Sequence, residues 1–303
     1  MILSLNYEGF SLSFMKKFIK LVSGKFMKET RTTIYYTDEL NDEFSLTQIQ
    51  PRKIDGNYDY DGKPFTRKLA RLFCYRIIAT PLAWLFLKLS YGHKIVGKEK
   101  IREYVKSQKK ATEKKGFMLF GNHTNDMADA YIPTMITFPN PAYVIVHANN
   151  VSMPFMGKIT PYLGAIPLPD DLAAARNFKT SIDRKMAKAW PVVLYPEAHI
   201  WPFYTKIRPF TEVSFRYPIQ YDVPVFSFTN TYQKKKFGKN PKIVTYIDGP
   251  FYANKDLDLK NRKIDLRNKV YNQMCERSIL NTVELIKYVK KELFYMLVKI
   301  MMK

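Results

Sequence analysis

From His93 onward, short apolar runs alternate with longer segments in which apolar and charged residues are mixed. This alternation predicts strands that alternate with helices, and therefore an α/β fold in which helices flank a mixed sheet. The expected strands are 94–97, 117–120, 142–147, 192–195, 223–229 and 243–247. The expected helices run over 100–115, from about Ala128, and over 172–190.

Segment 68–92 is the most apolar part of the chain. Its longest uncharged run, 77–87, has 11 residues, whereas a helix needs ~20 to span a bilayer. Pro81 predicts a kink within it. We therefore expect a helix or helical hairpin that lies in a membrane interface, with Trp84 and Tyr91 at the level of the headgroups. An ordinary buried core helix is the alternative.

The two ends of the chain differ from this central part. Residues 1–67 predict an extension without a secretory signal, in which a basic amphipathic stretch, 14–27, precedes an acidic one, 36–44. Residues 259–303 predict a helical tail, divided by a break near Ser278, that either docks on the core or contacts the membrane again. The predicted division of the chain is 1–67, 68–92, 93–258 and 259–303.

The charge of the chain indicates the kind of partner it binds, and its cysteines indicate the redox compartment. The chain of 303 residues carries 49 Lys and Arg against 27 Asp and Glu, a formal net charge of +22. Such an excess predicts an anionic partner, which is a membrane leaflet, a nucleic acid or a phosphorylated substrate. Cys74 and Cys275 show neither the spacing of a metal site nor a disulfide framework, which favours a reducing cytoplasm.

Candidate chemistry concentrates after the strand 117–120. The turn 122–124 follows it and leads to a helix with acidic residues in its first turn. His123 then stands at the end of a strand, with Asp126 and Asp129 within a turn or two. Enzymes build general bases in this way, because a carboxylate fixes the imidazole tautomer while the other ring nitrogen takes a proton from a hydroxyl. A capped turn with a solvated His is the alternative.

A second carboxylate, Glu197, follows Pro196 shortly after an apolar run. Further blocks read Met-Pro-Phe-Met-Gly at 153–157, Leu-Gly-Ala-Ile-Pro at 163–167 and Val-Pro-Val at 223–225. Together with Asn122-His123 and its nearby Asp, these blocks stand in the order found in the glycerolipid acyltransferases. The chain resembles that family, the lysophosphatidate acyltransferases, over about 95–250.

The chain departs from the family pattern at several positions. The first block of the family is His, four residues and Asp, whereas Ala128 stands at that position here and Asp129 follows it. The third block of the family reads Pro-Glu-Gly-Thr-Arg, whereas residues 196–200 read Pro-Glu-Ala-His-Ile. The second block lacks its terminal Arg and reads Pro-Leu-Pro-Asp over 167–170. The resemblance is therefore to a divergent branch.

The resemblance implies a glycerolphosphate-acyltransferase-like fold and an O-acyltransferase of phospholipid synthesis. In that family the His removes the proton from an acceptor hydroxyl as its oxygen attacks a thioester carbonyl, a role that falls here to His123. Asp129 is the expected partner of His123, with a bulge in the first helical turn that absorbs the extra residue. Asp126 is the competing partner, or else an N-cap.

The resemblance also implies an acceptor site around the third block. Glu197 stands where the family has a Glu that helps to bind glycerol phosphate. Lys206 and Arg208 are candidates to replace the missing Arg, because a phosphate needs forked or point-charge donors. The remaining candidate contacts are Asn122, Pro196 and His199.

The expected partners are an acyl-CoA or acyl-carrier-protein (acyl-ACP) donor, a lysophospholipid acceptor and anionic membrane lipids. We expect peripheral or monotopic attachment on the cytoplasmic face of the membrane, and neither a cofactor nor a metal, since the spacing of His123 and its Asp residues is not a recognised zinc pattern. The competing hypothesis is a catalytically altered basic protein that binds membranes or RNA on the same fold. No RNA-binding motif is visible, so no nucleic-acid partner is expected.

Overall fold

The computed structural model describes residues 33–44, 50–61, 69, 72–154, 156–236 and 240–291. The chain forms two compact units, residues 1–36 with 285–303 and residues 37–284. In the smaller unit, β1 (Thr33–Tyr36) pairs in parallel with β9 (Lys287–Lys290). Residues 259–278 are helical, up to the break predicted near Ser278. At 287–290 the strand corrects the predicted helix, because the aromatic and β-branched residues at the centre of β9 favour a strand. The basic stretch 14–27 and residues 292–303 lie outside the described residues.

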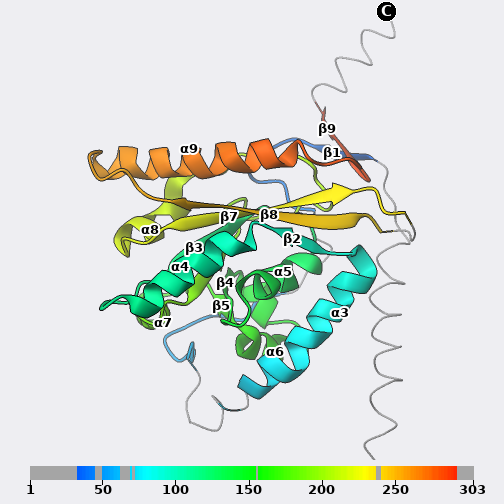
Figure 1. The fold of residues 1–303 in the computed structure, drawn as a ribbon. Helices are drawn as coiled ribbons and strands as arrows, with labels where there is room; N and C mark the ends of the chain where they lie inside the picture. The colour runs from blue at the N-terminus through cyan, green and yellow to red at the C-terminus, as the bar shows by residue number, and fades with distance from the viewer. Residues whose placement is uncertain are drawn as a thin grey trace, which may run out of the picture. The chain divides into compact units, whose positions relative to one another are not determined.

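The larger unit contains a sheet of seven strands in the order β2-β8-β7-β3-β6-β4-β5 (Figure 1). The strands are β2 (Lys94–Val96), β3 (Phe117–Gly121), β4 (Tyr143–Val146), β5 (Ala165–Pro167), β6 (Pro191–Leu194), β7 (Val225–Gln233) and β8 (Lys242–Phe251). The run from β7 to β5 is parallel, β8 is antiparallel to β7, and β2 is parallel to β8. The mixed sheet with its flanking helices confirms the predicted fold class.

Helices cover both faces of this sheet (Figure 1). The longer helical elements are η1 (Cys74–Ala79), α3 (Thr80–Tyr91), α4 (Lys98–Lys110), α5 (Ala128–Thr137), α7 (Leu172–Met186), α8 (Arg216–Gln220) and α9 (Leu259–Ser278). On β3, Phe117 and Leu119 pack into the cluster with α3, α4 and α5. Met118 and Phe120 pack into the cluster with α7 and α9. The strand is apolar throughout because both of its faces are covered.

The parallel strands decide where the site forms. β3 and β6 are neighbours in register, with Phe120 opposite Leu194. The segments that follow these two strands therefore leave the sheet at the same edge. In open α/β sheets this carboxyl edge is where ligands bind.

The apolar segment 68–92 is helical over η1 and α3. Pro81 lies at the start of α3, where the continuous helical backbone changes from the π-helical η1 to an α-helix. Leu87 is buried in the cluster with α5, whereas the side chains of Ile77 and Trp84 are 62% and 55% exposed. The helix thus packs on the domain along one side and carries apolar side chains on the other. Among the described residues, no helix is long and apolar enough to cross a membrane.

Several short elements have no counterpart among the predicted ones. They are β5, η2 (Ala148–Val151), α6 (Met156–Ile159), η3 (Thr160–Leu163) and η4 (Glu212–Phe215). Gly164 precedes β5 with φ +103°, and a Cβ there would lie 2.1 Å from the carbonyl oxygen of Ala142. Glycine therefore allows the chain to enter β5 beside β4.

Candidate active site

His123 follows β3 after one intervening residue, Asn122, at the carboxyl edge of the parallel strands. Its imidazole stacks on the ring of Tyr195, which follows β6, with the ring centroids 4.3 Å apart. Tyr195 in turn meets Phe228 of β7 edge to face. Gly121 permits this arrangement, because a Cβ on it would lie 2.1 Å from the Phe228 ring. Aromatic packing therefore holds one face of the imidazole.

Asp129 fixes the imidazole through one of its nitrogens. The Nδ1 of His123 lies 3.0 Å from Oδ2 of Asp129, whose side chain is 1% exposed. The same oxygen accepts the backbone N–H groups of Thr124 and Asn125, each at 2.8 Å. Because Oδ2 is an acceptor, Nδ1 carries the proton and Nε2 keeps its lone pair. The His123 side chain is 19% exposed, so the pair is open to solvent only through the imidazole.

The extra residue between His123 and Asp129 is absorbed in the turn before α5. The side-chain oxygen of Asn125 accepts the N–H of Ala128 at 2.9 Å, and its backbone oxygen accepts the N–H of Asp129, also at 2.9 Å. Asn125 therefore provides the capping contact that the sequence suggested for Asp126. Asp129 lies in the first turn of α5.

Asp126 lies near this pair and differs from Asp129 in its contacts. It is half-buried and makes no hydrogen bond or ion pair to the residues that the structure describes. Burial, together with the negative charge of Asp129, raises the pKa of its carboxyl from 3.8 to about 6, and His123 opposes this shift. Of the two carboxylates weighed from the sequence, Asp129 is the one in contact with His123.

Glu197 holds the loop that follows β6 against the loop that follows β3. Its side chain is buried, and its Oε2 accepts the backbone N–H of His123 at 2.9 Å. Its Oε1 accepts the N–H of Arg208 at 3.0 Å. Burial raises the pKa of the Glu197 carboxyl, and the Arg208 guanidinium and these N–H groups oppose the rise. The carboxylate is thus directed to backbone donors of the protein.

Arg208 is 0% exposed and lies inside the same loop. Its guanidinium donates to the backbone oxygens of Glu197 at 2.9 Å, of Glu39 at 3.1 Å and of His199. It also lies 4.0 Å from the Glu197 carboxylate. These partners hold the loop together, whereas the phosphate contact expected of Arg208 requires a guanidinium that reaches solvent.

The other candidate contacts divide into buried and solvent-reaching side chains. The buried amide of Asn122 accepts the backbone N–H of Asn230 at 2.8 Å and donates to its oxygen at 3.1 Å. Pro196 and His199 are half-buried, and His199 lies 3.6 Å from Glu43. Lys206 is exposed. Among the candidates for a phosphate contact, Lys206 and His199 therefore reach solvent.

Three contacts of the site were not anticipated from the sequence. The hydroxyl of Tyr195 donates to the backbone oxygen of Asp129 at 2.5 Å, and burial raises its pKa, which keeps it protonated. Asn230 donates to Oδ1 of Asp129 at 3.1 Å, and the Tyr232 hydroxyl lies 2.8 Å from that of Thr124. Tyr195 had a signal, its place at a strand end beside Pro-Glu. The two β7 residues had none, because sheet register brings them here.

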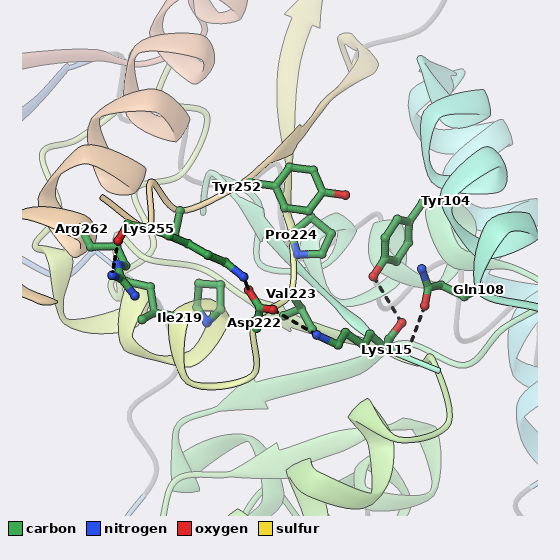
Figure 2. Close-up of a pocket in the computed structure, with 12 residues that line it drawn as sticks. Tyr104, Gln108, Lys115, Ile219, Asp222, Val223, Pro224, Tyr252, Lys255 and Arg262 are labelled. Atoms are coloured by element: carbon green, nitrogen blue, oxygen red, sulfur yellow. Dashed lines mark hydrogen bonds and ion pairs between the residues drawn. The ribbon is translucent and has the colours of Figure 1, made fainter. Parts of the chain in front are cut away.

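A cavity of about 300 Å³ lies at the opposite edge of the sheet (Figure 2). Lys115, which lines it, precedes β3, and Asp222 precedes β7, whereas His123 follows β3. Asp222 pairs there with Lys115 at 3.1 Å and with Lys255 at 2.8 Å. The cavity is therefore separate from the His123 site. Within the described part of the chain, no group of three His, Cys, Asp or Glu side chains is placed to hold a metal.

Residues 94–230 match the family model described as Acyltransferase, a range that includes both His123 and Glu197. Among solved structures, the chain is similar to the 1-acyl-sn-glycerophosphate (LPA) acyltransferase PlsC from Thermotoga maritima. The sequences are 17% identical, the match covers 72% of this chain and 84% of that one, and the TM-score is 0.47. No curated protein matches the chain.

Proposed function

We propose, since residues 94–230 belong to the acyltransferase family, that this chain moves an acyl group from a thioester to a hydroxyl of a lysophosphatidate-like glycerolipid. The observation that carries the proposal is the His123–Asp129 pair at the carboxyl edge of the sheet, with Nδ1 held and Nε2 left to accept a proton. The donor is acyl-CoA or acyl-ACP, and no cofactor takes part.

His123 acts as general base and then as general acid. Its Nε2 takes the proton from the acceptor hydroxyl while that oxygen attacks the thioester carbonyl carbon. Collapse of the tetrahedral intermediate breaks the carbon–sulfur bond, and the imidazolium returns the proton to the leaving thiolate. The products are an ester and a free thiol. The Asp129 carboxylate stabilises the imidazolium between these steps and keeps the ring in the required tautomer.

The acceptor phosphate is proposed to bind on the exposed side of the loop that begins at Glu197. Lys206 is exposed there and supplies the positive charge, and the half-buried His199 offers a ring nitrogen for a hydrogen bond. Glu197 and Arg208 contribute indirectly, because their buried polar groups hold the loop backbone in place. The buried amide of Asn122 instead joins the end of β3 to the backbone of β7.

Membrane attachment is proposed to run through η1 and α3. Exposed apolar side chains follow one another along this helix, and the chain carries a net charge of +22 that attracts anionic headgroups. The exposed members on these elements are Ile77, Ile78, Leu82, Trp84 and Leu89. The proposed attachment is peripheral and on the cytoplasmic face, which brings the site to its lipid acceptor.

The test measures acyl transfer from acyl-CoA or acyl-ACP to a panel of lysophospholipids, with release of the free thiol as the readout. His123→Ala is expected to lose about 100-fold or more in turnover while melting normally, because positioned proton transfer is commonly worth about 10²–10⁴-fold. Asp129→Asn should also lose turnover heavily, since an amide does not stabilise the imidazolium. Asp126→Asn, the matched control, should lose much less.

Two outcomes oppose the proposal. Full activity in His123→Ala with normal melting removes the mechanism. Vesicle or RNA binding by a wild-type protein that turns over no thioester favours a binding protein on this fold. A greater loss in Asp126→Asn than in Asp129→Asn leaves the proposal standing and reassigns the partner of His123.

A further inference from the structure

A chain of buried polar side chains extends from Asp129 away from the His123 site. The Nδ2 group of Asn230 lies 3.1 Å from Oδ1 of Asp129, the carboxylate oxygen that His123 does not contact. The hydroxyl of Thr245 lies 2.7 Å from Oδ1 of Asn230, and Nε2 of His93 lies 2.9 Å from that hydroxyl. Each of these side chains is at most 8% exposed.

The fold places the members of this chain on three separate elements. Asn230 and Thr245 face each other across the antiparallel pair β7 and β8, in register. Residues opposite each other on neighbouring strands project their side chains to the same face of the sheet. His93 follows the last turn of α3, just beyond its C-cap Gly92. Sheet register and the end of α3 therefore bring these residues beneath Asp129.

Only one direction of donation fits these contacts. Asn230 must turn its NH₂ group toward Asp129, because its carbonyl oxygen there would face a carboxylate oxygen. Its carbonyl oxygen then accepts the single hydroxyl proton of Thr245. That hydroxyl has no further proton to give, so Nε2 of His93 must carry one and donate it. All three donors point toward the carboxylate.

We propose that Asn230, oriented by Thr245 and His93, is a positioning residue that fixes the Asp129 carboxylate and through it the His123 ring. The inference rests on the proposed function, in which that ring exchanges protons with the substrates. Thr124 and Asn125 hold one oxygen of Asp129 with their backbone N–H groups, and Asn230 holds the other. With both oxygens held, the carboxylate plane cannot turn away from Nδ1.

The row of hydrogen bonds from Asp129 to His93 depends on the orientation of the Asn230 amide. An amide can present either its NH₂ group or its oxygen to Asp129, and the Thr245 hydroxyl selects the first. Without that hydroxyl, the selection depends on Asp129 alone. Misplacement of a catalytic group by about 1 Å can lower a rate about 100-fold, so a small loss of orientation is measurable.

The chain offers a matched set of variants. Thr245→Val removes the hydroxyl and keeps the shape, and Thr245→Ser keeps the hydroxyl and removes a methyl group. Thr229 is the control: it neighbours Asn230 on β7, is 0% exposed, and its hydroxyl has no hydrogen-bond partner among the described residues. Thr229→Val therefore makes the same chemical change in the same sheet, at a residue that is not part of the hydrogen-bonded row from Asp129 to His93.

The experiment measures kcat and KM, the melting temperature, and the proton NMR signal of the His123 Nδ1–H. We expect Thr245→Val to lose about fivefold in kcat, the equivalent of one hydrogen bond, with KM unchanged. Asn230→Ala should lose about tenfold or more. Thr245→Ser should recover the loss, and Thr229→Val should match the wild type. The Nδ1–H signal, identified by its absence in His123→Ala, should shift in Thr245→Val and remain in place in Thr229→Val.

The outcomes separate this inference from the function on which it rests. If His123→Ala is inactive but Thr245→Val behaves as Thr229→Val does, in both kcat and the NMR signal, the positioning role is refuted and the proposed function stands. If Thr245→Ser loses as much kcat as Thr245→Val, packing explains the effect and the role is also refuted. If His123→Ala is fully active, the proposed function fails first.

Discussion

Replacing Asp126 by an asparagine is expected to stabilise the fold at neutral pH. In the folded protein the Asp126 carboxyl has a pKa of about 6, against 3.8 for an ordinary Asp, chiefly because it is buried. The folded protein therefore binds this proton more tightly than the unfolded chain does. Above pH 6 the ionised carboxylate lowers the free energy of unfolding, and this cost disappears as the pH falls through 6 toward 3.8.

The size of the effect follows from the two pKa values. A rise from 3.8 to about 6 corresponds to about 3 kcal/mol at 1.36 kcal/mol per unit, fully present above pH 7. At pH 4 the same shift leaves about 0.5 kcal/mol. The asparagine amide would be half-buried at the same position, and burying a polar group without a hydrogen-bond partner costs free energy, so the net stabilisation is smaller. We therefore expect a net stabilisation of about 2 kcal/mol at pH 7.5 and little at pH 4.

The assay is urea unfolding of wild type and Asp126→Asn at several values between pH 4 and pH 7.5. Asp222→Asn is the control, because Lys255 and Lys115 hold the pKa of Asp222 below its usual range. That variant should gain nothing at neutral pH. A gain in Asp126→Asn that is equal at pH 4 and pH 7.5, or absent at pH 7.5, refutes the reasoning.

Three further predictions concern other parts of the larger unit. Burial lowers the pKa of His93 from 6.5 to about 4, so the unfolded chain binds more protons than the folded protein between these pH values, and stability falls as the pH falls. When the pH is lowered from 7 to 5, the free energy of unfolding measured in urea should therefore fall by about 2 kcal/mol less in His93→Gln than in wild type. Ala198 has φ +64° and is exposed, and Ala198→Gly should raise the unfolding free energy by about 0.5–1 kcal/mol, whereas a loss would mean that the left-handed backbone is not strained. The double variant Ile77→Asp/Trp84→Asp should bind anionic vesicles less than wild type at high salt, where inserted apolar surface dominates. The control Ile279→Asp, a change at another exposed apolar residue, should bind as wild type does. Equal binding by wild type, the double variant and the control would contradict attachment through η1 and α3.

Of the strands that the sequence predicts, the short ones lie close to their predicted positions, including the largely exposed β2, whereas the end of β7 lies four residues beyond its predicted end. β3 and β6 are continuous apolar runs, and each lies within one or two residues of its predicted position. β9 was predicted as helix, because apolar residues at helical spacing surround four residues whose pairing with β1 depends on a distant segment. β5 has three residues and shows no period, so its position follows from Gly164 and its contact with the preceding strand.

The residues of the candidate site also divide into those that the local sequence pattern indicates and those that only the register of the sheet brings together. His123 and Glu197 were candidates from the sequence because each lies near a predicted strand end, and Asp129 because of the resemblance to the first acyltransferase block. Asn230 and Thr245 could not, since their contact exists only through the register of β7 and β8. A residue that only holds another side chain of the candidate site has no strand-end position to reveal it.

The loop 196–208 differs from the third block of the family pattern at two positions that bear on its structure. Ala198 stands where the pattern has Gly, and its φ of +64° is a left-handed value that glycine adopts without strain. The pattern places an Arg two residues beyond that Gly, whereas here Arg208 returns from further along the chain to bind the backbone of Glu197. Its buried guanidinium stabilises a loop in which Ala198 has a left-handed backbone.

The buried position of Arg208 has a consequence for the proposed acceptor site. A buried Arg208 leaves the exposed side of the loop to Lys206, whose ammonium is a point charge, and to the half-buried His199. A point charge attracts a phosphate without the two-pronged geometry by which a guanidinium selects it. The proposed acceptor site should therefore discriminate less sharply between a phosphate monoester and other anionic headgroups than a site built around an exposed Arg. The breadth of acceptors in the lysophospholipid panel, compared between wild type and Lys206→Arg, measures that difference directly, and a wild type restricted to phosphate monoesters would contradict it.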